Sequence, residues 1–161
     1  MRRLYIQQKV FKITDHYPIT DEAGNAVYQV DQDFQLIGKT VHVTDPSGRH
    51  LFTVKRELLT FLPRFVVEFA DGNVLKLQSK LAFFRQVIEV QPTSVGITIE
   101  GDFFSKNFDV LRNGQLIGRI NRKLFSIGDK FAIEVADESN EELFIAVMIA
   151  VDSIIDAQQK S

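Results

Sequence analysis

The chain has 161 residues, a length that suits one domain able to bury most of the surface of its unfolded form. Apolar residues make up 45% and charged residues 25%, which is the usage of a globular protein rather than a disordered or membrane protein. Cysteine is absent, so disulfides, thiolate catalysis and cysteine-ligated zinc are excluded. The net charge of −2 argues against a dedicated nucleic-acid-binding protein, which is usually strongly basic.

The N-terminal segment MRRLYIQQKVFKI is basic, but Gln7, Gln8, Lys9 and Lys12 interrupt the apolar stretch that a signal peptide needs. We therefore expect a first strand at this position. The sequence also has no Asn-x-Ser/Thr sequon, so it offers no support for secretion. These features predict a cytoplasmic protein.

Glycines recur with a period of 24 residues, at positions 24, 48, 72 and 96. The first three lie in similar phrases, DEAGNAVYQV, DPSGRHLFTV and FADGNVLKLQ, and a later phrase, LRNGQLIGRI, keeps an Asn-Gly pair. Glycine tolerates a positive φ, and an aspartate side chain can accept hydrogen bonds from its own backbone. Each phrase therefore predicts a β-hairpin, with tight turns at Gly48 and Gly72.

Two strands per repeat predict about a dozen strands between residues 3 and 136. Strands this regular, with no helix between them, favour a closed antiparallel barrel or a sandwich. A closed barrel also leaves no exposed sheet edge.

The pattern changes near the C-terminus, where twelve of the fifteen residues 143–157 are apolar. A helix is predicted over residues 140–157, with Ser139 and Glu142 as its capping box and a short polar tail at 158–161. The unbroken apolar run is nine residues long, well short of the roughly 20 that cross a bilayer. A helix that is apolar on every side is buried, so Val147, Met148 and Val151 should be inaccessible to water.

Only a closed barrel covers all faces of such a helix. The sequence therefore predicts a single, mostly β domain over residues 1–161. Its architecture is a closed antiparallel β-barrel of about twelve strands around a central hydrophobic C-terminal helix.

Several phrases together resemble the LURP-one-related family, as a small bacterial-type member. They are KLFSIGDKFAIEV (123–135), the D-x-x-G turns at 21–24 and 45–48, IEGDFFSKNFDV (99–110) and ELFIAVMIAVD (142–152). The resemblance covers about residues 3–157. It implies the tubby C-terminal-like fold, a roughly twelve-stranded barrel around a hydrophobic helix that is also proposed for phospholipid scramblases. It further implies a binding or scaffolding module, since tubby-type domains recognise phosphoinositide headgroups through exterior Lys and Arg. No local motif transfers those residues to this chain.

Catalytic and metal-binding signals are weak in this sequence. The chain has three histidines, none in H-x-H or H-x-x-x-H spacing: His16, His42 and His50. Asp31 and Asp33 resemble the start of a calcium loop, but Leu36 and His42 occupy the positions that need Gly and Glu. Nucleophile elbows, P-loops and dinucleotide fingerprints are also missing. We expect a protein that is not an enzyme, with no catalytic residue, metal or cofactor.

Basic residues flank two apolar segments of residues 49–130, a region with thirteen Lys/Arg against eight Asp/Glu. Lys55, Arg56 and Arg64 flank LLTFLP, and Lys80 and Arg85 flank LAFF. Basic residues beside apolar ones suit contact with anionic lipid headgroups or another anion, at the periphery of a membrane. The simpler alternative is that these are solvated charges at strand ends. A protein-interaction or structural scaffold domain is a third reading, and it predicts an exposed apolar patch of several hundred Å².

Overall fold

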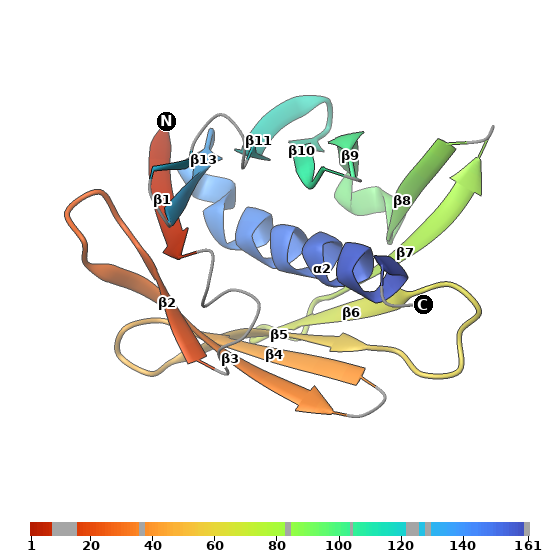
Figure 1. Cartoon of the computed structure of the whole chain (residues 1–161), viewed down its shortest axis with the longest axis horizontal. Helices are drawn as coiled ribbons and strands as arrows, with labels where there is room; N and C mark the ends of the chain where they lie inside the picture. Colours follow the sequence, from red (N-terminus) through yellow and green to blue (C-terminus); the bar gives the residue numbers. More distant parts are fainter. Residues whose placement is uncertain are drawn as a thin grey trace.

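The computed structural model describes residues 1–7, 16–35, 38–82, 85–103, 105–121, 126–127 and 130–159. Its strands form one antiparallel sheet that curls around the long helix α2 (Figure 1). The elements are β1 Arg2–Gln7, β2 His16–Thr20, β3 Ala26–Gln35, β4 Gly38–Thr44, β5 His50–Arg56, β6 Arg64–Phe69, β7 Val74–Ala82, β8 Arg85–Gln91, η1 Thr93–Val95, β9 Ile97–Asp102, β10 Asn107–Arg112, β11 Gln115–Ile120, β12 Ser126–Ile127, β13 Lys130–Val135, η2 Glu138–Asn140 and α2 Glu141–Gln159.

The sheet follows the order β8-β7-β6-β5-β4-β3-β2-β1-β13-β11-β10-β9, and the short β12 pairs with β13. The pairing of β1 with β13 joins the two ends of the chain over six residues, with Leu4 opposite Ile133. Strands β8 and β9 form the two ends of this path and have no ladder between them in the part of the chain that the structure describes. The predicted mostly β barrel around a helix is therefore confirmed, with one open seam between β8 and β9.

The hairpin turns have the predicted chemistry. Gly48 and Gly72 have φ values of 89° and 92°, the left-handed region that glycine enters without steric cost. The Asp45 carboxylate accepts two backbone N–H bonds of its own turn, at 2.9 and 3.0 Å. Asp21 accepts the equivalent pair of bonds in the β2–β3 turn, at 3.0 and 2.9 Å. These side chains replace backbone partners that the sharp turn removes.

The start of α2 differs from the prediction. Ser139 lies in the turn η2, and both its backbone N–H and its hydroxyl donate to Asp137, at 3.0 and 2.6 Å. Asp137 takes these bonds because a carboxylate is a stronger acceptor than a hydroxyl and lies two residues away. The predicted box of Ser139 and Glu142 is replaced by this turn, and α2 begins at Glu141.

The core is formed by α2 and the inner face of the barrel. Every residue from Phe144 to Ser153 is at most 2% exposed, and the three residues predicted to be buried, Val147, Met148 and Val151, are at 0%. Aromatic side chains of the strands pack around the helix, among them Phe52, Phe65 and Phe131. The phenylalanine-rich strands therefore supply the apolar lining that the helix requires.

The helix packs tightly against the sheet at Gly118 of β11. A Cβ atom built on this glycine would lie 2.3 Å from Cδ1 of Phe144, a buried residue in the first turns of α2. The absence of a side chain is what lets the ring pack on the strand backbone.

We expect Gly118→Ala to lower the free energy of unfolding by about 1–3 kcal/mol, because the added methyl overpacks a closed core. For a domain of this size the melting temperature should fall by roughly 3–10 °C in calorimetry. Gly38→Ala is the matched control, since a Cβ there meets nothing closer than 3.8 Å. Equal melting of the two variants would contradict the close approach.

A buried cation holds the C-terminal half of α2. Lys106 lies in the β9–β10 turn with φ 59°, and its side chain is 7% exposed. Its Nζ atom lies 3.4 Å from Asp152 Oδ1 and 2.5 Å from Asp156 Oδ1, both on α2. The lysine therefore compensates carboxylates that lie toward the negative end of the helix dipole.

Lys106→Met should destabilise the fold by about 3–5 kcal/mol, because it leaves the Asp152 carboxylate buried without this cation. The measurement is urea unfolding, with Lys130→Met as an exposed control expected to change stability by less than about 0.5 kcal/mol. Adding Asp152→Asn should recover part of the loss, since it removes the buried charge. A double variant less stable than Lys106→Met alone would contradict this account.

Candidate functional site

The connection between β5 and β6, residues 57–63 with the sequence ELLTFLP, is the most unusual surface feature, and we call it the apolar loop. Leu58 is 54% exposed, and Leu59 and Phe61 are fully exposed. Leu59 also has a φ of 63°, which is rare for a residue with a branched side chain. The loop therefore presents apolar side chains to water from a backbone conformation that costs energy.

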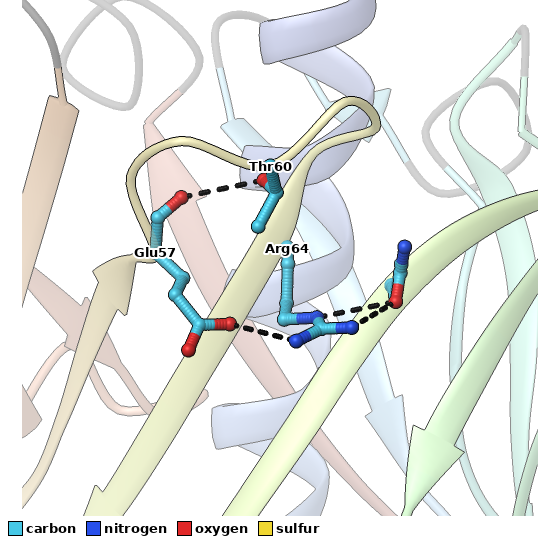
Figure 2. Close-up of polar contacts among 4 residues, drawn as sticks. Glu57, Thr60 and Arg64 are labelled. Atoms are coloured by element: carbon cyan, nitrogen blue, oxygen red, sulfur yellow. Dashed lines mark hydrogen bonds and ion pairs between the residues drawn. The ribbon is translucent and has the colours of Figure 1, made fainter.

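Arg64 fixes the base of this loop (Figure 2). Its Nη1 atom donates to Glu57 Oε2 at 3.1 Å, and its Nε and Nη2 atoms donate to Gln78 Oε1 at 3.1 and 2.7 Å. The backbone closes the base as well, since Glu57 N–H donates to Arg64 O at 2.8 Å. Thr60 Oγ1 donates to Glu57 O at 3.5 Å within the loop. Side-chain and backbone hydrogen bonds thus hold the base of the loop, while Leu59 and Phe61 at its tip stay in water.

Three of the five predicted patch residues share the outer face of β5–β7. The side chains of Phe65, Val67, Leu75 and Leu77 are buried on the inner face, so the alternate positions face outward. By this alternation Lys55, Arg64 and Lys80 lie on the outer face. So does Lys76, opposite Val66 of β6, which the sequence analysis did not select. The alternation of Leu75 and Leu77 around Lys76 is the signal that identifies it.

The other two predicted residues stand apart from this group. Arg56 is the last residue of β5 and lies opposite the buried Phe65 of β6. By the alternation of side chains it therefore belongs to the inner face of the sheet. The backbone of Arg85 begins β8, but its side chain lies outside the described part of the chain.

Each of the three grouped residues has an acidic partner. Lys55 Nζ lies 2.7 Å from Glu68 Oε1, Arg64 pairs with Glu57, and Lys80 pairs with Glu89. The hydrogen bond from Lys80 is the main reason that the pKa of Glu89 is lowered. Exposed pairs of this kind contribute little stability, so a competing anion can displace the carboxylates at small cost.

Two basic residues, Arg56 and Lys76, make no ion pair with any residue that the structure describes. Arg56 is half-buried at the base of the apolar loop, and Lys76 is exposed on β7. Their charge is therefore not already offset by a neighbouring carboxylate of the described chain.

The end of the barrel away from the apolar loop is acidic, and we call it the turn end. The β2–β3 and β4–β5 turns lie there beside the start of α2, at the left of Figure 1, while the apolar loop and the C-terminus lie at the right. The acids of these two turns, of the β6–β7 turn, of η2 with its cap and of the first turn of α2 are Asp21, Glu22, Asp45, Asp71, Asp137, Glu138, Glu141 and Glu142. Three arginines, Arg2, Arg49 and Arg112, lie among them and offset part of this charge.

A hollow of about 320 Å³ at the turn end is lined by groups of both signs. Tyr28 Oη donates to Glu141 Oε2 at 2.5 Å, and Arg2 Nε lies 3.4 Å from Glu141 Oε1. Burial raises the pKa of Tyr28 and of Glu142. The bonds of Glu141 to Tyr28 and Arg2 cross the hollow, so they hold α2 to the barrel.

A second hollow, of about 530 Å³, follows the seam and is lined by Gln86, Val87 and residues 99–103. Among the described residues, no group of three His, Asp or Glu side chains is arranged to hold a metal ion. His16 pairs with Asp31, and His42 and His50 both bond the Thr53 hydroxyl, at 3.1 and 2.8 Å.

Comparison with known proteins gives one family and one relative. A model of the LURP-one-related family matches residues 2–152. The chain is 23% identical over 155 residues to the uncharacterized protein YxjI of Bacillus subtilis (strain 168), covering 96% of this chain and 94% of that protein. No solved structure matches. Among the residues with a described position, no helix is long and apolar enough to cross a bilayer.

Arg64→Met should loosen the apolar loop, because it removes the bonds to Glu57 and Gln78 at the base. We expect chymotrypsin, which cleaves after Phe and Leu, to cut at Leu59 or Phe61 several times faster, while global stability falls by only about 1 kcal/mol. Lys55→Met is the control, since it removes an ion pair that does not touch the loop. Unchanged cleavage of Arg64→Met would show that the base does not depend on this arginine.

Proposed function

Because the chain belongs to the LURP-one-related family, we propose that it is a binding module without catalytic activity that contacts anionic lipid headgroups. The family and the barrel fold are compatible with a non-catalytic binding module. The contact surface in this proposal is the outer face of β5–β7 together with Arg56, and it includes the predicted residues Lys55, Arg56, Arg64 and Lys80. Lys76 joins them. The fifth predicted residue, Arg85 at the start of β8, stays part of the proposal on the sequence pattern alone.

The observation that carries the proposal is the placement of these cations. Lys55, Arg64 and Lys80 project from three neighbouring strands beside the apolar loop, while the acids of the turns lie at the other end of the barrel. A protein with this arrangement can turn its basic side to an anionic surface and keep its acidic turns in water.

The ion pairs on this face do not prevent such a contact. An exposed pair contributes about 0.2–1 kcal/mol, whereas a Lys or Arg near an anionic membrane gains about 1 kcal/mol. Lipid phosphates therefore compete with Glu57, Glu68 and Glu89 on nearly equal terms. Binding should be weak, and it should fall as salt rises because the attraction extends only about 8 Å at physiological salt.

The test is co-sedimentation with vesicles of phosphatidylglycerol and phosphatidylcholine at low and physiological salt. Charge reversal of Lys55, Lys76 and Lys80 to Glu should abolish sedimentation and leave Arg64 in place to hold the loop. The pair Glu68→Gln and Glu89→Gln should raise sedimentation several-fold, because it frees two lysines from their partners.

A matched control separates local charge from net charge. Glu22→Gln with Glu138→Gln removes the same two charges at the turn end, where both residues are exposed. This variant should sediment like the wild-type protein. Equal gains in both neutralised variants would mean that only net charge matters. Absence of sedimentation by the wild-type protein at low salt would remove the lipid proposal and favour a protein partner for this face.

A further inference from the structure

We propose that the apolar loop is a membrane-inserting element, whose Leu59 and Phe61 side chains enter the acyl-chain boundary of an anionic bilayer. The inference rests on the proposed lipid contact and goes beyond it, because headgroup binding by cations requires no insertion. In this proposal the hydrocarbon region of the membrane is the ligand of these side chains.

Exposed apolar side chains are concentrated in the apolar loop. Five large apolar residues are exposed in the described part of the chain, and three of them, Leu58, Leu59 and Phe61, lie within four consecutive positions. Single exposed apolar residues are ordinary on protein surfaces, but a cluster marks a contact site. The other two, Met1 and Val74, lie on different elements.

The fold holds these side chains outward. Pro63 is buried, and Arg64 and Glu57 close the base of the loop with side-chain and backbone bonds. Leu58 lies against the barrel, because its Cδ2 atom is 3.8 Å from the point that a Cβ atom added to Gly38, at the start of β4, would occupy. The left-handed backbone at Leu59 then leaves Leu59 and Phe61 at the tip. A strained backbone that exposes apolar side chains does not stabilise the folded protein. Binding of an external ligand by these side chains is therefore its best explanation.

The chemical groups along the barrel follow an order that matches an anionic bilayer. The tip is apolar, Arg56 and Arg64 lie at its base, Lys55 follows on β5, and the acids of the turns lie at the far end. An anionic bilayer presents the complementary order of hydrocarbon, phosphate and water along its normal. Inserting Leu59 and Phe61 therefore brings the arginines to the phosphates, together with Glu57 at the loop base, and keeps the acids of the turn end away from the membrane.

The size of the apolar surface also favours a bilayer over a protein. A specific protein interface buries about 800 Å² on each partner and has a packed apolar centre. Three side chains on one protruding loop are too few for that, whereas shallow insertion of a few apolar side chains is sufficient for reversible binding to a membrane surface.

The chain has no tryptophan, so one introduced indole reports on one site. We would compare Phe61→Trp with Val74→Trp, a control at an exposed apolar position on β7 beside the turn end. On addition of phosphatidylglycerol vesicles, Phe61→Trp should shift its emission to the blue and be quenched by lipids brominated on the acyl chains. Val74→Trp should show neither effect. Equal quenching of the two reporters would overturn the proposed orientation.

A second variant measures the binding that insertion contributes. Leu59→Ser with Phe61→Ser should weaken partitioning into these vesicles about tenfold or more, because the apolar area that leaves water is lost. Its melting temperature should stay within about 1 °C of the wild-type value, since both side chains are fully exposed in the fold. Val74→Ser is the control and should bind like the wild-type protein.

The outcomes separate this inference from the proposed function. Normal sedimentation of the double serine variant, together with an indole that stays in water in Phe61→Trp, would overturn insertion and leave headgroup contact by the cations intact. If neither the wild-type protein nor any variant sedimented with the vesicles, both the insertion and the headgroup contact would be ruled out. A blue shift of Phe61→Trp that grows with protein concentration in the absence of vesicles would assign the loop to a second copy of the chain and overturn the lipid assignment.

Discussion

The burial of α2 is the constraint on which the rest of the structure depends. Ten consecutive residues, Phe144 to Ser153, are almost completely removed from water, which requires apolar neighbours on every side of the helix. One face of a sheet covers one side only, so the sheet has to curl around the helix until its end strands β8 and β9 approach each other at the seam. The pairing of β1 with β13 lies in the middle of this sheet. The first and last strands of the chain thus pair beside a helix that is its last element. The barrel can be completed only when all of these segments are present, and its stability is therefore shared over the whole chain.

Because neighbouring strands are mostly antiparallel hairpins, the loops that connect them lie alternately at the two ends of the barrel. Folding places different requirements on the loop sequences at each end. At the turn end, tight turns need aspartate and glycine, and the positive end of the α2 dipole favours acids such as Glu141 and Glu142. The acidic character of this end therefore follows from folding requirements alone. At the other end, the β9–β10 turn holds α2 through Lys106. The apolar loop has no comparable bond to the helix among the described residues, so its sequence is available for binding.

Local patterns in the sequence were enough to predict the turns at Gly48 and Gly72 and the buried helix, because both depend on residues that are neighbours along the chain. The arrangement of the basic residues depends instead on strand register. Lys55 and Arg56 are adjacent in sequence but alternate between the two faces of β5. Alternation with Leu75 and Leu77 places Lys76 on the outer face, but it comes near Lys55 only because β6 pairs with both β5 and β7. The partners Glu57, Glu68 and Glu89 come from three separate segments. The close contact of Gly118 with Phe144 is equally non-local, because the two residues lie on β11 and α2.

The apolar loop is the place where local sequence and global fold disagree most, and the disagreement has a physical meaning. LLTFLP has the composition of a buried segment, yet Arg64 holds it outside the core. In the proposed binding mode two weak terms act together. Cations give about 1 kcal/mol each, and apolar side chains give about 25 cal/mol for each Å² that leaves water. Salt screens the first term and leaves the second intact. The charges would therefore select an anionic surface and orient the barrel, while the inserted side chains would set how long the protein remains there.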